Sequence, residues 1–158
     1  WGFGSGIASG RFGILFQNRG AGFTLAEGHP NEAAGGKRPM HTIIPAMLRQ
    51  GGRIVIPFGV MGGDYQPLGH AHVTSNLLDF GMDLQEALDA PRSMAEDGVL
   101  KLERGYPQAT RAALVAMGHR VEEPDGPLGG GQAIRIDESR GLLIGASNTR
   151  KDGCALGY

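Results

Sequence analysis

Gly59-Val-Met-Gly-Gly-Asp-Tyr-Gln-Pro-Leu-Gly-His-Ala71 is the stretch that decides the fold, because a strand gives way to a helix within it. An apolar run at residues 54–58 precedes it and predicts a buried strand. Pro67 suits the first turn of a helix, and a helical pattern follows it. Gly62 and Gly63 are therefore expected to form the turn between the two elements, since glycine accepts positive φ at no steric cost.

The pair Gly62 and Gly63 has two interpretations. Successive backbone amides in such a turn can hold an anion or a developing oxyanion. The same residues can equally serve only to make a tight turn, which is a common use of paired glycines. The local pattern leaves both interpretations open.

The segments on either side of this turn predict two hairpins. Residues 41–48 indicate a strand that connects through a Gly-Gly turn to residues 53–58, although Pro45 confines part of the first strand to an edge or a bend. Residues 132–137 and 142–146 bracket a second turn. Antiparallel pairing is therefore expected to dominate.

The remaining pattern adds helices and short strands. Helices are predicted at residues 68–80, after the capping-box sequence Asp83-Leu-Gln-Glu86, and at residues 107–117. Further strands are predicted at residues 12–16 and 99–102, and a flexible loop at residues 126–131. Val73, Leu77 and Phe80 are expected on one helical face. This order favours an α+β fold with largely antiparallel sheets, in a single domain over residues 1–158.

Composition narrows the classes of function. The net charge of the 158 residues is −1 and there is no long basic run, which gives nucleic-acid or anionic-membrane binding little support. The apolar runs are too short to span a bilayer. Cys154 is the sole cysteine, so no internal disulfide can form. The first residue is Trp1 and no signal peptide follows, so we expect a processed chain or one that begins partway into a longer protein.

Two polar groups are candidates for substrate binding. In Lys37-Arg-Pro-Met-His-Thr42, His41 or Thr42 can hydrogen-bond a carboxylate, or Thr42 can simply form a turn while His41 lies on a polar surface. Arg19 lies in a glycine-rich turn, where a guanidinium can bind a carboxylate through two parallel hydrogen bonds. Most surface arginines do nothing so specific, so the structural interpretation stays open for Arg19 as well.

The sequence does not support the other common types of functional site. His70 and His72 are two residues apart and cannot chelate a metal as an i, i+4 pair does, and the other histidines are scattered. Cys154 lies in a polar tail without an evident base. We find no Ser-His-Asp pattern, phosphate loop or dinucleotide fingerprint.

Several motifs occur in an order that resembles the γ-glutamyltransferase (γ-glutamyltranspeptidase) family, and the resemblance spans nearly the whole chain. They are the runs Phe3 to Ile7, Gly13 to Asn18, Gly36 to Pro39, Gly59 to Gly63, Leu78 to Arg92, Met117 to Arg120, Gln132 to Asp137 and Gly145 to Gly153, with the ending Gly157-Tyr158. The Asp-Phe-Gly-Met-Asp sequence and the C-terminal run are specific in combination.

The resemblance implies an N-terminal-nucleophile hydrolase with an αββα sandwich, incomplete in this chain. In that family a precursor cleaves itself into large and small subunits, and the new N-terminal Thr of the small subunit attacks the γ-glutamyl amide with its own α-amine as base. The chain resembles the small subunit without its beginning, so the nucleophile is expected upstream of Trp1 and the isolated chain is expected to be inactive. The resemblance implies no cofactor and no metal, the large subunit as partner, and a small-molecule amide such as glutathione as substrate.

The site residues of the family are matched at some positions of this sequence and replaced at others. The oxyanion-hole glycines match Gly62 and Gly63, and the paired serines that hold the donor's α-carboxylate fall on His41 and Thr42. A polar residue near the donor falls on Arg19, and the acid that binds the donor's α-amino group falls on Gly22. These departures resemble the cephalosporin-acylase-like branch. An acyl group with a carboxylate and no amine, such as glutaryl, would suit Arg19 and Gly22 better.

Three functions are thus left open. The first is a γ-glutamyl hydrolase or transferase, and the second is an acylase for carboxylate-tipped acyl groups. The third is a non-catalytic structural or interaction domain. A Thr shortly before Trp1 would favour the first two.

Overall fold

A computed structural model describes residues 4–157, so Trp1, Gly2, Phe3 and Tyr158 lie outside the described residues. The chain divides into two compact units, Trp1–Thr42 and Ile43–Tyr158. Among the described residues, no helix has the length and apolar character needed to cross a bilayer.

The first unit has little regular structure. It contains the 3₁₀ helix η1 (Arg19–Gly22) and two isolated bridges, Ala8 with Leu15 and Thr24 with Glu32. The strand predicted at residues 12–16 is wrong: Phe12 is 68% exposed, and no described residue of this unit is buried. An apolar run becomes a buried strand only where another layer covers it, and within the described part of this unit none does.

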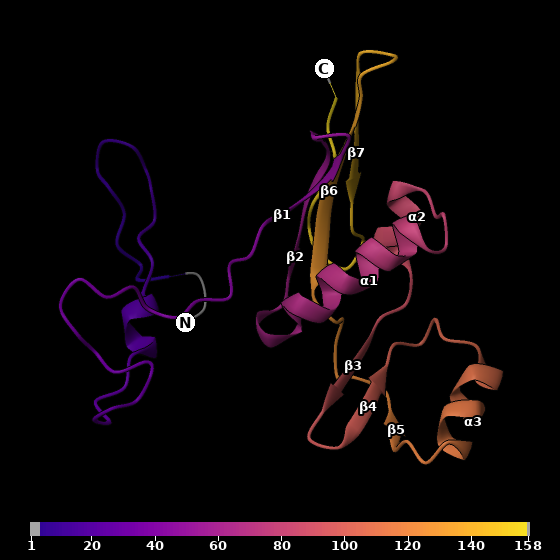
Figure 1. The fold of residues 1–158 in the computed structure, drawn as a ribbon, viewed down its shortest axis with the longest axis horizontal. Helices are drawn as coiled ribbons and strands as arrows, with labels where there is room; N and C mark the ends of the chain where they lie inside the picture. The colour runs from indigo at the N-terminus through magenta and orange to yellow at the C-terminus, as the bar shows by residue number, and fades with distance from the viewer. Residues whose placement is uncertain (1–3, 158) are drawn as a thin grey trace. The chain divides into compact units, whose positions relative to one another are not determined.

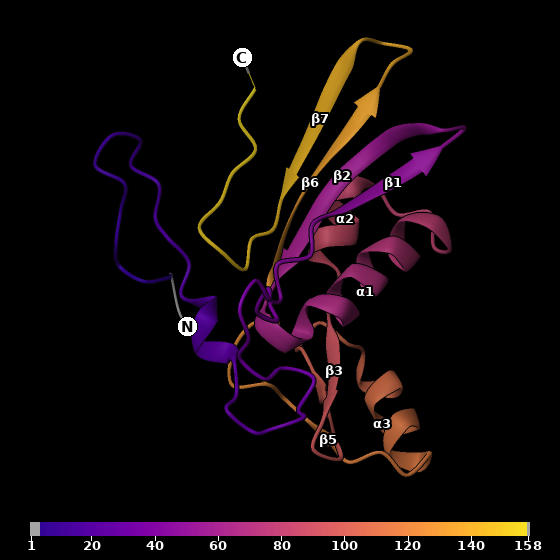
Figure 2. The same cartoon turned by 60° about the vertical axis from the view of Figure 1, so that its left-hand side comes forward.

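The second unit is built on a four-stranded antiparallel sheet in the order β1-β2-β6-β7 (Figure 2). The strands are β1 (Ala46–Gln50), β2 (Arg53–Met61), β6 (Gly130–Asp137) and β7 (Leu142–Ser147). Both predicted hairpins are confirmed. The first strand begins later than residue 41, because Pro45 cannot donate to a ladder and β1 starts directly after it.

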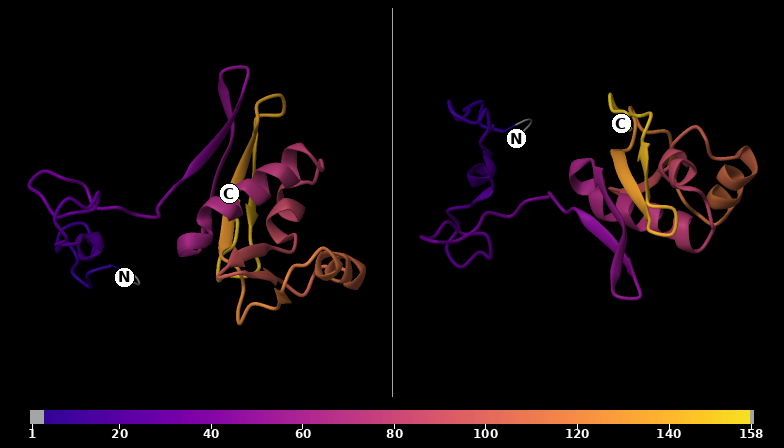
Figure 3. Two further views of the ribbon diagram at one scale, coloured as in Figure 1. Left: turned by 60° about the horizontal axis from the view of Figure 1, so that its bottom comes forward. Right: turned by 90° about the horizontal axis from the view of Figure 1, so that it is seen from above.

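Helices α1 (Gln66–Leu78) and α2 (Leu84–Asp89) lie on one face of this sheet (Figures 1 and 3). Their buried side chains, Val73, Leu77, Leu84, Ala87 and Leu88, form the core with Ile56, Phe58, Val60, Ala133 and Ala146. Phe80 is exposed, contrary to the prediction, because α1 ends at Leu78 and Gly81 turns the chain away with φ +63°.

A second, smaller sheet has the order β3-β4-β5. It consists of β3 (Ser93–Glu96), β4 (Val99–Leu102) and β5 (Val121–Glu122), and α3 (Gln108–Ala116) connects the last two. The loop predicted at residues 126–131 is wrong in its second half. Leu128 to Gly131 are buried, and β6 already starts at Gly130, because these small residues pack closely against β2.

Candidate active site

The turn at Gly62 and Gly63 lies where the sequence predicts it. β2 ends at Met61, and the single 3₁₀ turn η2 (Gly63–Tyr65) leads directly into α1. Gly62 has φ +138° and Gly63 has φ +58°, and both residues are exposed. Within residues 4–157, neither of their backbone N–H groups donates a hydrogen bond to a protein acceptor. Two adjacent N–H donors on exposed residues are thus left without an acceptor among the described residues.

Close backbone packing explains the glycine at position 62. A Cβ on Gly62 would lie 2.9 Å from Cα of Gly129, and a Cβ on Gly129 would lie 2.2 Å from the carbonyl oxygen of Met61. The two segments therefore pass each other with no room for a side chain. Gly63 faces open space, so only its positive φ favours glycine there.

A cleft of about 310 Å³ opens beside this turn. Its lining includes Gly62, Asp64, Tyr65, Leu128, Gly129 and Lys151. Gly62 therefore lies at the edge of this recess.

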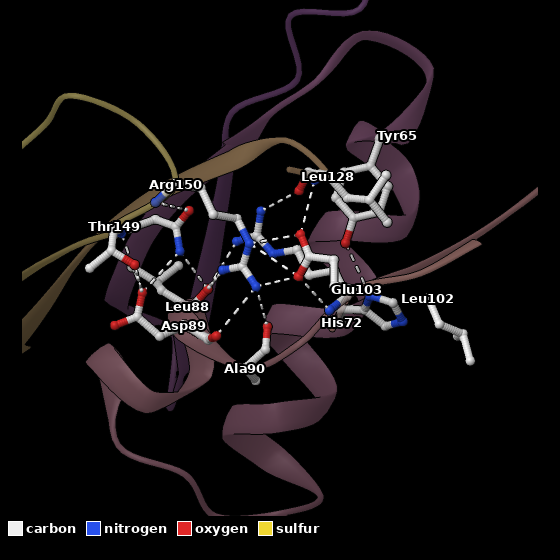
Figure 4. Close-up of polar contacts among 12 residues, drawn as sticks. Tyr65, His72, Leu88, Asp89, Ala90, Leu102, Glu103, Leu128, Thr149 and Arg150 are labelled. Carbon is white, nitrogen blue, oxygen red and sulfur yellow. Dashed lines mark hydrogen bonds and ion pairs between the residues drawn. The ribbon is translucent and has the colours of Figure 1, made fainter. Parts of the chain in front are cut away.

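Leu128, which lines the cleft, also belongs to a buried polar group that we call the Glu103 cluster, made of Glu103, Arg92, Arg150 and the backbone of Leu128. Figure 4 shows Glu103 between Arg150 and Leu128. Arg92 immediately precedes β3 and Glu103 immediately follows β4, so the antiparallel pairing of these strands brings the two residues together. The side chains of Arg150 and Glu103 form an ion pair and are only 13% and 11% exposed.

Glu103 accepts hydrogen bonds from several donors at once. Its Oε1 accepts from the N–H of Leu128 at 3.0 Å and from Nε of Arg150 at 2.9 Å, and its Oε2 accepts from the N–H of Arg92 at 2.9 Å. Burial alone would raise the pKa of Glu103, but these hydrogen bonds outweigh it and hold the pKa below its usual value. The carboxylate is therefore ionised in the native protein near neutral pH.

A second polar chain runs from Tyr65 through His72 to Ser93. The Tyr65 hydroxyl lies 3.1 Å from Nδ1 of His72, and the Ser93 Oγ lies 3.4 Å from Nε2 of the same ring. Burial raises the pKa of Tyr65 to about 12, and burial together with the charge of Arg92 lowers the pKa of His72. Both groups are neutral at pH 7, and no carboxylate of residues 4–157 hydrogen-bonds this imidazole, so the chain fits a structural role better than nucleophile activation.

The predicted substrate-binding residues belong to the other unit. Arg19 begins η1, and its Nε lies 3.4 Å from Oε1 of Gln17. His41 is exposed and Thr42 is half-buried at the end of this unit. Gly62 and Gly63 belong to the unit Ile43–Tyr158. The role of Arg19, His41 and Thr42 in substrate binding stays a prediction.

Sequence reasoning missed the Glu103 cluster. Arg92 and Arg150 occur within runs that carried the family resemblance, which was an available signal, whereas nothing around Glu103 indicated its role. Among the described residues, no three His, Cys, Asp or Glu side chains come close enough to hold a metal ion.

The chain is similar to known proteins over its whole length. The family model described as Gamma-glutamyltranspeptidase matches residues 1–158. The chain is 38% identical over 164 residues to the glutathione hydrolase-like YwrD proenzyme of Bacillus subtilis, a match that covers 98% of this chain and 31% of that protein. It is also 38% identical over 165 residues to the oxamate amidohydrolase proenzyme of Klebsiella pneumoniae, covering 99% of this chain and 31% of that protein.

Solved structures are similar as well. The cephalosporin acylase from Bacillus halodurans superposes with a TM-score of 0.82 at 41% identity, covering 99% of this chain and 30% of that one. The γ-glutamyltranspeptidase from Pseudomonas nitroreducens in complex with L-DON gives a TM-score of 0.78 at 24% identity, covering 100% of this chain and 89% of that one, which shows the shared fold. The predicted N-terminal-nucleophile fold class is thereby confirmed.

The chain spans 31% of the length of each of the two proenzymes named above. Both relatives are thus considerably longer than this chain of 158 residues. The match to the family model over the whole chain, together with these identities, means that the chain belongs to the γ-glutamyltranspeptidase family.

Proposed function

We propose that the complete protein cleaves γ-glutamyl amides such as glutathione, by hydrolysis or by transfer to an acceptor amine, and that this chain supplies the oxyanion-stabilising turn. The observation that carries the proposal is the exposed pair of N–H donors at Gly62 and Gly63, which have no protein acceptor within residues 4–157. Preorganised N–H donors of this kind stabilise the charge that develops on a carbonyl oxygen during acyl transfer.

The proposed chemistry is a covalent two-step reaction. The hydroxyl oxygen of an N-terminal Thr upstream of Trp1 attacks the amide carbon, and the α-amine of the same Thr takes the hydroxyl proton. The carbonyl oxygen becomes negative and is held by the N–H groups of Gly62 and Gly63. When the C–N bond breaks, the proton goes to the leaving amine, and water or an acceptor amine then releases the acyl group from its ester.

The proposed partner is the large subunit of the same precursor. Support comes from the relatives, which are proenzymes much longer than the matched region. Support also comes from the sheet face opposite α1 and α2, where strand alternation places Met47, Ile134 and Leu143, all exposed. A row of exposed apolar side chains on a sheet face is typical of an interface.

The release of p-nitroaniline from γ-glutamyl-p-nitroanilide by the complete protein tests this proposal. We expect turnover by the complete protein and none above background by the 158 residues alone, since loss of the nucleophile removes most of the acceleration. No release from γ-glutamyl, glutaryl or butyryl anilides by folded complete protein would contradict the proposal and favour the non-catalytic interpretation.

A second candidate is an acylase for carboxylate-tipped acyl groups such as glutaryl. Arg19 in η1 and Gly22 at its end favour it, because a guanidinium suits a carboxylate and position 22 carries a glycine in place of the acid that would bind a donor amine. The similarity to a cephalosporin acylase at 41% identity supports this candidate too.

Arg19→Ala in the complete protein tests the second candidate. A charge-assisted contact contributes about 1.5–3 kcal/mol, so kcat/KM for a glutaryl anilide should fall about ten- to a hundredfold. The butyryl anilide, which has no carboxylate, should be cleaved by Arg19→Ala and wild type alike. Arg11→Ala, an exposed arginine of the same unit, serves as the matched control. An equal loss for both donors would mean that Arg19 only supports the fold.

A further inference from the structure

We infer that Glu103 and Arg92 are positioning residues for the oxyanion turn, and that they act on it through Leu128 and Gly129. The inference rests on the proposed function for its catalytic consequence. Its structural part, that the cluster fixes the place of Gly62, stands on contacts alone.

Both polar groups of the Leu128 backbone are held by the Glu103 cluster. The N–H of Leu128 donates to Oε1 of Glu103 at 3.0 Å, and its carbonyl accepts from Nη1 of Arg92 at 2.8 Å. A loop residue held at donor and acceptor by two buried side chains has little freedom to shift, because each lost contact would leave a backbone N–H or C=O of Leu128 without its partner.

The segment that follows Leu128 packs directly against the turn. Gly129 follows Leu128 and packs so closely against Met61 and Gly62 that neither glycine has room for a Cβ. Gly130 then pairs with Met61 as the last rung between β2 and β6. The position of Leu128 therefore determines where the Gly62 backbone can lie.

Arg92 also contacts the other end of the turn. Its guanidinium lies 5.9 Å from the centre of the Tyr65 ring, and Tyr65 is the residue at which η2 passes into α1. Arg92 itself is 2% exposed, and a third hydrogen-bond partner, the carbonyl of Leu88, accepts from its Nη2 at 3.1 Å. One buried side chain thus supports the segments on both sides of Gly62 and Gly63.

Two variants of the complete, processed protein test the inference. Gly129→Ala places a methyl group against the carbonyl of Met61 and displaces the turn while it leaves every side chain of the cluster intact. Gly141→Ala is its matched control, since Gly141 has φ +65° against +67° for Gly129 but a Cβ there meets nothing within 4 Å. Glu103→Gln removes the charge and one acceptor oxygen from the cluster.

Two measurements are compared with wild type for each variant that folds. The first is amide hydrogen exchange of the peptide over residues 59–66, and the second is kcat and KM for an acyl anilide. We expect Gly129→Ala and Glu103→Gln to exchange at least tenfold faster in this peptide and to lose about ten- to a hundredfold in kcat with KM within twofold, because a displacement of the donors affects the transition state. Gly141→Ala should change neither quantity by more than twofold.

The outcomes separate the inference from the proposed function. Wild-type exchange at residues 59–66 in folded Glu103→Gln, or wild-type kcat in that variant, would overturn the inference. If Glu103→Gln fails to fold, the same result in folded Gly129→Ala would overturn it. If the wild-type protein cleaves no anilide, the proposed function fails, whereas the exchange measurement still decides whether the cluster fixes the turn.

Discussion

Glu103 stabilises the second unit only as long as its partners remain. It is ionised and almost buried, and Arg150, Arg92 and Leu128 together supply the donors that compensate for its lost hydration. The Arg53–Glu138 ion pair has the same chemistry, but both side chains are exposed. Exposed pairs contribute little because water screens them and competes for their hydrogen bonds.

Removal of the Glu103 carboxylate and removal of the Glu138 carboxylate should therefore lower the free energy of unfolding by very different amounts. We expect Glu103→Ala to lower the free energy of unfolding by about 3–5 kcal/mol, since the buried guanidinium of Arg150 loses its carboxylate partner and the backbone N–H groups of Arg92 and Leu128 lose their acceptor. Glu138→Ala should change it by less than about 1 kcal/mol. Urea unfolding at pH 7 measures both, and similar losses for the two variants would mean that the cluster is not a buried structural unit.

His72 should give stability a dependence on pH in the mildly acidic range. Burial first, and the charge of Arg92 second, lower the pKa of His72 below its ordinary 6.5, with Glu103 opposing them. As pH falls through 6.5 the unfolded chain binds the proton before the native protein does, so the free energy of unfolding decreases until the native pKa is passed.

The His72→Gln variant isolates this contribution. Its free energy of unfolding should decline less between pH 7.5 and pH 5 than that of wild type, and urea unfolding at several pH values measures the difference. Parallel pH profiles for the two proteins would show that His72 titrates alike in both states, against the expectation.

The Glu103 cluster is a part of the candidate site that the sequence alone could not predict. Glu103 and Arg150 are separated by 47 positions, and their contact depends on how the two sheets are arranged. No local pattern contains that information. Gly62 and Gly63 were predictable because the strand, the turn and the Pro67 helix start all lie within one short stretch.

At the scale of elements, α2 shows why local chemistry predicted some structure correctly. The Asp83 side chain accepts from the Glu86 N–H at 2.8 Å, and the Glu86 side chain accepts from the Asp83 N–H at 3.0 Å. This reciprocal capping box depends entirely on four consecutive residues, so a local pattern is enough to predict it. The strand predicted at residues 12–16 failed for the opposite reason, because burial of an apolar run depends on segments elsewhere in the chain.

The capping box offers a direct test at this scale. Asp83→Ala should lower the free energy of unfolding by about 1 kcal/mol, while Asp83→Ser, which keeps an acceptor oxygen, should retain most of the stability. Urea unfolding of both variants measures this. If Asp83→Ser loses as much as Asp83→Ala, the carboxylate charge rather than the cap stabilises α2.

At the scale of the whole molecule, the chain provides one antiparallel sheet with helices on one face and an exposed apolar row on the other. The sequence predicted the α+β class because hairpins and helix boundaries are local. It could not predict β3 or the two-residue β5, which are too short to carry a period of their own. Nor could it predict that Trp1–Thr42 forms a separate unit without buried residues in its described part.

The mass of the complete protein, before and after mixing with an acyl anilide, tests the central claim most directly. The purified protein should consist of two chains, and the chain that contains Gly62 and Gly63 should gain the mass of one acyl group on its N-terminal Thr when the reaction is rapidly quenched. A single uncleaved chain, or an acyl group found on the other chain, would contradict the claim that these residues belong to the nucleophile-bearing subunit of an amide-cleaving enzyme.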